Sequence, residues 1–405
     1  MRPRGKRTPA QSKRRHRAGG MLPRALAAGA GLVWVLWPGS GLTHVTTTNT
    51  VVFEREIAGI LRRHCTDCHA PGRPGAPLMS YEDVWLARED VLASVLTRRM
   101  PPWAAVAGYG EFANENALTL RERQFLVSWV EGLGPRNAGE VFLNVPDSAG
   151  DTEAAAPGPG AEAWELGEPA LVLELPDSST QDGTDGGDEV RIRRVVLDPE
   201  LAEDRELSGV EYQPVDRESA RGASFFLERT GRWLGSWTPW HSGTLLPPSV
   251  AHTLRAGDRV VAEILYSAGG EGTVAGGRIG LHLTPESRAT ASPAVEILLE
   301  AHEGTPAGDG LTRIHAEATV GGAVRVLALL PSRERGVRSL EVSARLPDGR
   351  TEILLLAQDI PHGWPTPYLL AEPVPIEGGS TLHATAYYEN AEPAPANLRV
   401  AVSAF

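Results

Sequence analysis

The chain has 405 residues, a formal net charge of −12 and only two cysteines. The length predicts two or three domains, and an apolar content of 41% with 22% charged residues is ordinary for globular protein, which excludes a disordered chain. Because both cysteines lie in one short motif, no cysteine remains for a structural disulfide or a Cys-based zinc site. The acidic surplus argues against nucleic acid as a partner and favours cationic partners.

The N-terminus has the pattern of an export segment. Residues 1–24 carry nine Lys or Arg and no acid, residues 25–38 are apolar, and Gly39, Ser40 and Gly41 follow. This pattern predicts a signal peptide or an uncleaved N-terminal anchor over residues 1–41, although the apolar run is short for a membrane span. We therefore expect a periplasmic or other extracytoplasmic location. Cleavage would leave 39 − 9 = 30 basic residues against 51 acidic ones, a net charge of −21.

Residues 50–135 are predicted to be helical. An apolar stripe along residues 53–61 runs directly into the first cysteine. Ser80 is a helix N-cap, and the helix that it opens is expected to continue to Leu96. A capping box over residues 119–122 begins a third helix, which Gly132 or Gly134 ends.

The chain beyond residue 140 changes in character. Residues 150–163 are rich in Ala, Pro and Gly and predict a flexible linker, and the acidic segment 177–188 predicts a solvated loop. Short apolar runs between turn residues predict strands at 171–175, 190–197, 259–266, 295–299, 324–330, 340–346 and 381–388. Residues 347–350 predict a hairpin turn.

These patterns define a multidomain fold class. We expect a small all-α domain over residues 50–140, a linker over 141–163, and two antiparallel β-sandwiches over 164–290 and 291–405, although a single sandwich also fits.

The motif that carries chemistry is Cys65-Thr66-Asp67-Cys68-His69. A C-x-x-C pair alone also suits a redox dithiol, but the histidine that follows at once indicates covalent haem attachment. Two thiols at this spacing can bond the two vinyl groups of haem, and His69 is then the proximal ligand of the iron.

The second axial ligand is expected to be Met100, which precedes Pro101, Pro102 and Trp103. The prolines halt the preceding helix and present its last side chain, and a thioether ligand would raise the reduction potential. The alternative is that Met100 only packs the domain. Met79 is expected in the core, and His64 is poorly placed to reach the opposite haem face.

Residues 57–134 resemble bacterial c-type cytochrome domains of the CxxCH…MPPW kind. The shared features are the Cys65–His69 motif, a Pro-rich loop over residues 71–77, Tyr-Glu-Asp at 81–83, Met-Pro-Pro-Trp at 100–103 and Trp-Val-Glu-Gly at 129–132. The resemblance implies one covalent haem c, Met100 as axial ligand, and electron transfer to a redox partner protein.

The remainder, about residues 163–400, resembles the two-sandwich module of ascorbate-dependent type II copper monooxygenases. The markers are residues 164–169, 210–214, 254–258, Trp364 with Tyr368, and the closing segment 387–397. The copper-ligand positions implied by the resemblance are substituted: they fall on residues 223–225, 265–266 and 331–336, none of which is histidine. Seven histidines are scattered through this half without a His-His or His-x-His pair, so we do not expect bound copper.

Three functions remain in competition. The leading hypothesis is an exported monohaem electron carrier whose β module is non-catalytic and serves for docking, with no catalytic residues. The second is a haem-coupled oxidoreductase or monooxygenase with an atypical copper site. The third is a haem sensor or peroxidase with an open sixth coordination position. Aromatic residues around Trp233, Trp237 and Trp240 form either a partner surface or core.

Overall fold

The computed structural model describes residues 51–137, 163–176, 184–185, 190–267, 276–284, 291–364, 367–389 and 397–405. All of them belong to one compact unit, Thr48–Phe405. The predicted export segment 1–41 and nearly all of the predicted linker 141–163 lie outside the described residues, as does most of the acidic segment 177–188.

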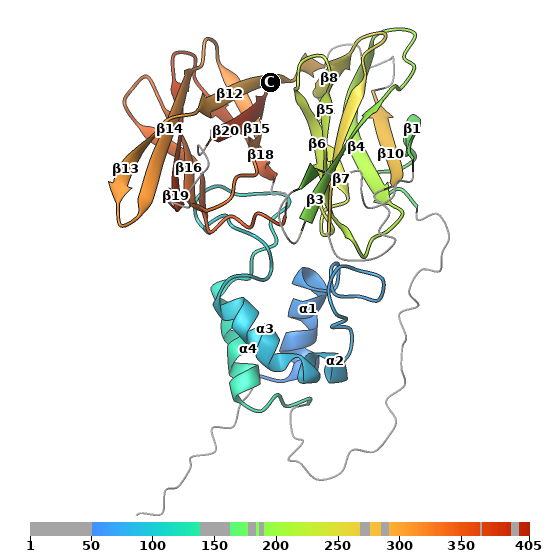
Figure 1. Cartoon of the computed structure of the whole chain (residues 1–405), viewed down its shortest axis with the longest axis vertical. Coiled ribbons are helices and arrows are strands. Elements are labelled where there is room, and N and C mark those ends of the chain that lie inside the picture. Colours follow the sequence, from blue (N-terminus) through green and yellow to red (C-terminus); the bar gives the residue numbers. More distant parts are fainter. Residues whose placement is uncertain are drawn as a thin grey trace, which may run out of the picture. The chain divides into compact units, whose positions relative to one another are not determined.

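A short helical region comes first (Figure 1). A π-helical turn, η1 (Phe53–Ile57), leads into α1 (Ala58–His64), and α2 (Tyr81–Leu86), α3 (Arg88–Leu96) and α4 (Leu120–Glu131) follow. Both predicted caps are present: Ser80 with Asp83 and Thr119 with Glu122 form reciprocal capping boxes. The predicted end of the last helix is also correct, because Gly132 is its C-cap. Phe53, Ile57, Trp129 and their neighbours pack one apolar core beneath these helices.

Three expectations for this region are wrong. The helix expected from Ser80 to Leu96 is interrupted at Ala87, where ψ opens to 3° and Arg88 donates a hydrogen bond to the carbonyl of Trp85. Met79 is 49% exposed, because its neighbour Leu78 takes the inward position in the extended segment before α2. Residues 97–118 contain no helix; instead this segment forms isolated β-bridges, Ala105 with Ala357 and Phe112 with Leu370.

The mostly-β remainder is built of several antiparallel sheets in a sandwich-like arrangement (Figure 1). One six-stranded sheet has the order β1-β10-β4-β8-β11 with β7 beside β4, and it faces a five-stranded sheet, β2-β3-β9-β5-β6, across an apolar core. The strands are β1 (Leu171–Leu175), β2 (Thr184–Asp185), β3 (Val190–Leu197), β4 (Arg205–Pro214), β5 (Ala220–Leu227), β6 (Trp233–Trp237), β7 (Gly243–Leu245), β8 (Val250–Leu254), β9 (Val260–Ser267), β10 (Gly277–Leu283) and β11 (Ser292–Pro293).

A second pair of sheets follows. A four-stranded sheet, β12-β20-β15-β18, packs against a five-stranded sheet, β13-β14-β19-β16-β17. The strands are β12 (Val295–Ala301), β13 (Gly304–Gly308), β14 (Leu311–Thr319), β15 (Val324–Pro331), β16 (Val337–Arg345), β17 (Thr351–Gln358), β18 (Tyr368–Ile376), β19 (Thr381–Glu389) and β20 (Leu398–Ala404). The predicted turn at residues 347–350 joins β16 to β17, and Gly349 supplies its positive φ of 89°.

The helical region is joined to the β region by residues 103–112. Trp103 and Phe112 belong to the apolar core of the second pair of sheets, where both contact Tyr368 at ring-centroid distances of 5.3 and 5.4 Å. Asn114 fastens the same segment, since its side chain donates to the carbonyl of Pro367 and accepts from the backbone of Leu369. Among the described helices, none is long and apolar enough to cross a membrane.

Candidate functional site

The four residues chosen from the sequence lie around one cavity. Cys65, Cys68, His69 and Met100 all line a space of about 330 Å³, most of whose other lining residues come from α1, α3 and the loops between them. Leu61, Leu78, Val95 and Leu126 supply apolar walls. A concave, mostly apolar space with a few convergent polar groups is the usual form of a cofactor site.

The two thiols and the imidazole are presented by a tight turn at the end of α1. The backbone N–H of Cys68 donates to the carbonyl of Cys65 at 3.1 Å, and the N–H of His69 donates to the same carbonyl at 2.8 Å. This turn directs Cys65, Cys68 and His69 to one cavity although they span only five positions of sequence.

His69 is held in one orientation. Its Nδ1 lies 2.8 Å from the carbonyl oxygen of Ala76, so Nδ1 carries the proton and donates, which leaves the lone pair on Nε2. Gly75 lies against the ring: a Cβ at this position would sit 2.4 Å from His69 Nδ1. The loop therefore needs glycine here in order to seat the imidazole.

The thiols are not prepared for dithiol exchange. Burial, followed by the negative charge of Asp67, raises the pKa of Cys65 to about 12, and the same two causes raise the pKa of Cys68 to about 12. Both cysteines are free of a disulfide. Since the thiolate is the reactive form and redox dithiols have a lowered pKa, this environment argues against the redox-dithiol alternative.

Met100 reaches the cavity from the end of α3. The N–H groups of Arg99 and Met100 both donate to the carbonyl of Ser94, at 2.9 and 3.2 Å, and this winds the chain out of the helix. Pro101 and Pro102, which cannot continue a helix, line the cavity beside Met100.

One side of the cavity is lined by His64 and by Asn116, which no sequence pattern marked. His64 Nδ1 lies 3.1 Å from Asn116 Oδ1, and Asn116 is only 3% exposed. Glu122 Oε1 lies 3.4 Å from His64 Nε2. Burial raises the pKa of the Glu122 carboxyl, but hydrogen bonds from Arg63 and Thr119 outweigh this and lower the pKa to about 2.

The β region contributes to the same cavity. Arg221, on β5, and Trp364, between β17 and β18, both line it. The Arg221 guanidinium lies over the Trp364 ring at 4.8 Å, and its Nε donates to Ser267 Oγ at 3.0 Å. A cation therefore lies at the wall of a mostly apolar space.

The donor set fits a c-type haem. Two free thiols at C-x-x-C spacing, an imidazole whose Nδ1 is occupied by a carbonyl, and a thioether share one apolar cavity. Cys65 and Cys68 would hold the macrocycle, and His69 and Met100 would ligate the iron.

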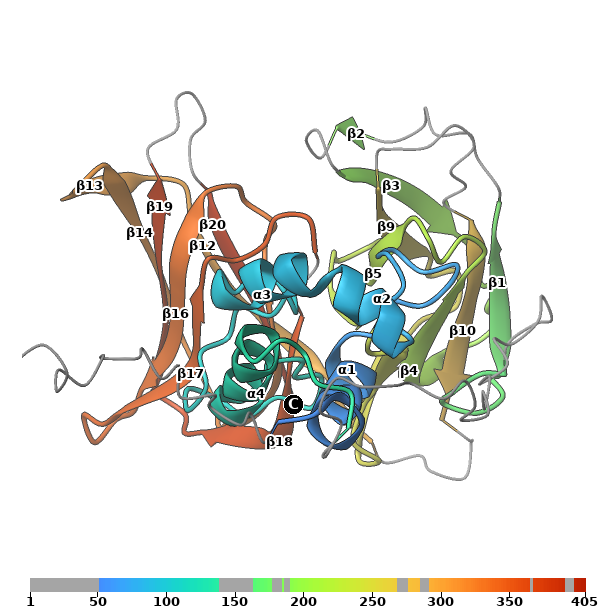
Figure 2. The same ribbon diagram turned by 90° about the horizontal axis from the view of Figure 1, so that it is seen from below.

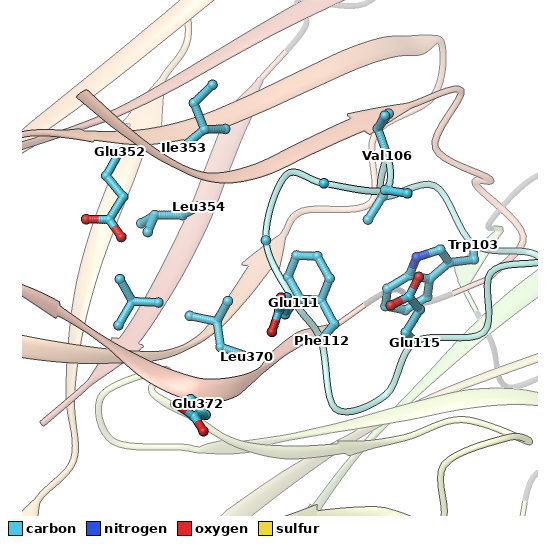
Figure 3. Close-up of a pocket in the computed structure, with 15 residues that line it drawn as sticks. Trp103, Val106, Glu111, Phe112, Glu115, Glu352, Ile353, Leu354, Leu370 and Glu372 are labelled. Carbon is cyan, nitrogen blue, oxygen red and sulfur yellow. The ribbon is translucent and has the colours of Figure 1, made fainter. Parts of the chain in front are cut away.

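A second cavity, of about 460 Å³, lies where residues 103–115 meet β17 and β18 (Figure 3). Its lining includes the aromatic rings of Trp103 and Phe112 and four carboxylates, Glu111, Glu115, Glu352 and Glu372. The lining contains no histidine, cysteine, lysine or arginine. This composition suits a cationic group.

At two of the three sets of expected copper-ligand positions, buried apolar residues stand instead. Ala223, Leu265 and Tyr266 are each at most 3% exposed and pack in apolar cores. Of the three tryptophans weighed as a partner surface, Trp233 and Trp237 are core, being 2% and 3% exposed, while Trp240 donates to the carbonyl of Asn114.

Two of the histidines that are scattered in the sequence lie together in the structure. His315 on β14 and His383 on β19 stack with ring centroids 5.4 Å apart, and Glu317 lies beside both. No sequence motif marks this group, because only the register of β14 against β19 brings it together.

Comparisons with known proteins give no family. No protein family matches the chain, and no curated protein matches it. Among solved structures, the major capsid protein P2 of bacteriophage PM2 is 11% identical, with 57% of this chain and 96% of that chain covered and a TM-score of 0.22. A Paenibacillus xanthan lyase is 11% identical over 57% of this chain and 26% of its own, with a TM-score of 0.18. Similarity this low supports no inference about function.

Proposed function

We propose that the protein is an exported monohaem c-type cytochrome that transfers electrons. The observation that supports this most directly is the convergence of Cys65, Cys68, His69 and Met100 on one apolar cavity, with His69 Nδ1 held by the carbonyl of Ala76. Haem bound there would supply a one-electron Fe(III)/Fe(II) couple. The basic N-terminal segment supports export. Covalent attachment of haem to the two thiols would then take place outside the cytoplasm.

The surrounding residues favour electron transfer over chemistry on a substrate. A thioether in the cavity would fill the sixth coordination position, which a peroxidase or a ligand sensor needs open. Apolar walls and the buried Asn116 would limit access of water to the iron, and a dry, fixed environment keeps the reorganisation that accompanies electron transfer small.

For the β region we propose a non-catalytic docking role. Its residues Arg221 and Trp364 already reach the haem cavity, and the carboxylate-lined cavity at Glu111 and Glu372 would favour a cationic surface on a redox partner protein. The likeness of this region to copper monooxygenase modules rests on sequence markers, and the copper-ligand positions are substituted.

Covalent haem attachment is tested by exporting the full chain in a host that matures c-type cytochromes. Haem staining after denaturing electrophoresis should show one haem per chain, and Cys65→Ala with Cys68→Ala should abolish the stain. His302→Ala, at an exposed histidine of the β region, is the matched control and should stain normally. A wild-type chain that carries no covalent haem would overturn the proposal.

Met100 is tested on the same haem-loaded protein. Met100→Ala should remove the Met–Fe(III) charge-transfer band at the red end of the visible spectrum and lower the reduction potential. Met79→Ala is the control, because Met79 is half-exposed and is not among the residues that line the cavity. An unchanged spectrum in Met100→Ala would mean that Met100 only packs the domain.

A further inference from the structure

We propose that His315, Glu317 and His383 form a binding site for a divalent transition-metal ion on the β14–β19 face, independent of the haem cavity. The three side chains offer one ligand atom each, and these atoms all lie within 4.8 Å of one another. No motif predicted this grouping.

The register of the sheet builds the site. β14 pairs antiparallel with β19 so that Glu317 stands opposite His383 and His315 stands opposite Thr385. Along β19, burial alternates strictly, with Leu382, Ala384 and Ala386 in the core. His383 and Thr385 therefore point to the other face of the sheet, where His315 and Glu317 also lie. Figure 2 shows β14 and β19 as neighbouring strands.

One carboxylate oxygen faces both imidazoles. Glu317 Oε2 lies 3.8 Å from His315 Nε2 and 3.7 Å from His383 Nδ1. These separations are too long for hydrogen bonds. They are close to the ~3.3 Å that separates two ligand atoms on a tetrahedral ion with bonds of 2.0–2.1 Å. Small rotations of the side chains would bring all three atoms to one ion.

His315 is oriented for ligation by a neighbour. Its Nδ1 lies 2.9 Å from Thr385 Oγ1, within hydrogen-bond distance, and its Nε2 faces Glu317. When Nδ1 donates to this hydroxyl, Nε2 carries the lone pair that a metal ion needs. Metal-binding histidines commonly have their other ring nitrogen fixed by such a hydrogen bond. The near-parallel stacking with His383, at an interplanar angle of 24°, presents both rings to the same side of the sheet.

The donor chemistry selects the class of ion. Two imidazoles and one carboxylate suit Zn²⁺, Cu²⁺, Ni²⁺ or Fe²⁺ and disfavour Mg²⁺ and Ca²⁺, which need mostly oxygen ligands. Three protein ligands leave at least one coordination position for water. Because the Glu317 side chain is 65% exposed, ordering it on binding costs entropy, and we expect a dissociation constant in the micromolar range for Zn²⁺.

The test is calorimetric titration of ZnCl₂ into the full chain carrying Cys65→Ser and Cys68→Ser, so that no thiolate competes and the outcome does not depend on haem. One Zn²⁺ should bind per chain, and MgCl₂ should not bind. Adding His315→Ala and His383→Ala should weaken zinc binding at least tenfold, and Glu317→Gln should weaken it less. The control is His302→Ala, whose imidazole also lies near a glutamate, Glu300 at 3.6 Å, but has no second histidine beside it.

A second measurement needs no substitution in the site. Diethyl pyrocarbonate labelling of the same chain, mapped by mass spectrometry, should show that ZnCl₂ protects His315 and His383 and leaves His302 reactive. The proposal is overturned if Zn²⁺ does not bind stoichiometrically, if the double variant binds as tightly as its parent, or if protection falls elsewhere.

Discussion

The helical region and the β region assemble their candidate sites by different means. In the helical region, Cys65, Cys68 and His69 are neighbours in sequence, and one turn at the end of α1 brings them together. In the β region, His315 and His383 come from strands far apart in the chain, and only the pairing of β14 with β19 makes them neighbours. A site built from a local motif can be recognised in the sequence, whereas a site built by strand register cannot.

The two regions also differ in what their packing requires. The helices have a core of their own around Ile57 and Trp129. Trp103, Ala104 and Phe112, although they lie between α3 and α4, belong to the core of the second pair of sheets. In sequence this segment, residues 103–112, lies within the helical region, but its apolar side chains pack in the β region.

Trp103→Ala is expected to have the largest effect on stability, and it tests whether segment 103–112 is part of the β core. Trp103 is 8% exposed and contacts Phe112 and Tyr368, so truncation should lower the free energy of unfolding by about 3–5 kcal/mol through loss of burial and creation of a cavity. The measurement is denaturant unfolding followed by circular dichroism at a wavelength dominated by strands.

Tyr109→Ala, on the same segment but 38% exposed, should change stability far less. If the β transition of Trp103→Ala coincided with that of the wild type, the segment would not be coupled to the β core, and the description of a shared core would fail.

A smaller effect concerns acid sensitivity of the β region. Burial, together with the charge of Arg232, lowers the pKa of His252 from 6.5 to about 3. Between these values the unfolded chain binds more protons than the folded one, so the free energy of unfolding decreases as pH falls below 6.5. From pH 7 to pH 5 this residue alone should cost about 2 kcal/mol.

His252→Gln should remove that part of the pH dependence, as measured by urea unfolding at pH 7 and pH 5. His302→Gln serves as the control because its imidazole is 66% exposed. Equal pH slopes in the wild type and His252→Gln would show that the imidazole is already charged in the folded protein or is hydrated.

The smallest effect concerns the contact between the β region and the candidate haem cavity. Arg221→Gln removes a positive charge from the cavity wall. Because a nearby cation favours the less positive Fe(II) state, its loss should lower the reduction potential by tens of millivolts, on the order of 20–50 mV. Spectroscopic redox titration of the haem-loaded protein measures this shift.

Arg194→Gln, on β3 with a 66% exposed side chain, is the control and should leave the potential unchanged. A potential in Arg221→Gln equal to that of the wild type would mean that Arg221 does not act on the haem.

Local signals in the sequence predicted local structure well. The N-cap at Ser80, the capping box at Thr119, the turn at residues 347–350 and strands such as β1 and β3 appear where their patterns place them. Features that depend on contacts between side chains or between distant segments could not be predicted in this way. The break at Ala87 depends on a side chain of the next residue. β14 was not predicted although Ile314, Ala316 and Ala318 alternate with polar residues, because alanine is a weak strand former.

For the candidate site too, the local part could be predicted from the sequence and the long-range part could not. The motif at Cys65–His69 is contiguous and could be found, whereas Asn116, Arg221 and Trp364 reach the cavity from distant segments. Their roles depend on how the loop and the β strands pack, which residue types and spacing do not encode. The same holds for His383, which only the pairing of β14 with β19 brings beside His315 and Glu317.

The anchoring of Trp103 in the β core has a consequence for Met100. Only two residues separate them, and a chain of three residues spans at most about 11 Å. Because Trp103 is buried in the β core, it restrains the distance that Met100 can move away from the cavity. If Met100 ligates haem as we propose, loosening of the β core would let its thioether move farther from the cavity, so the coordination of the iron would depend on packing in a region that supplies none of the proposed ligands.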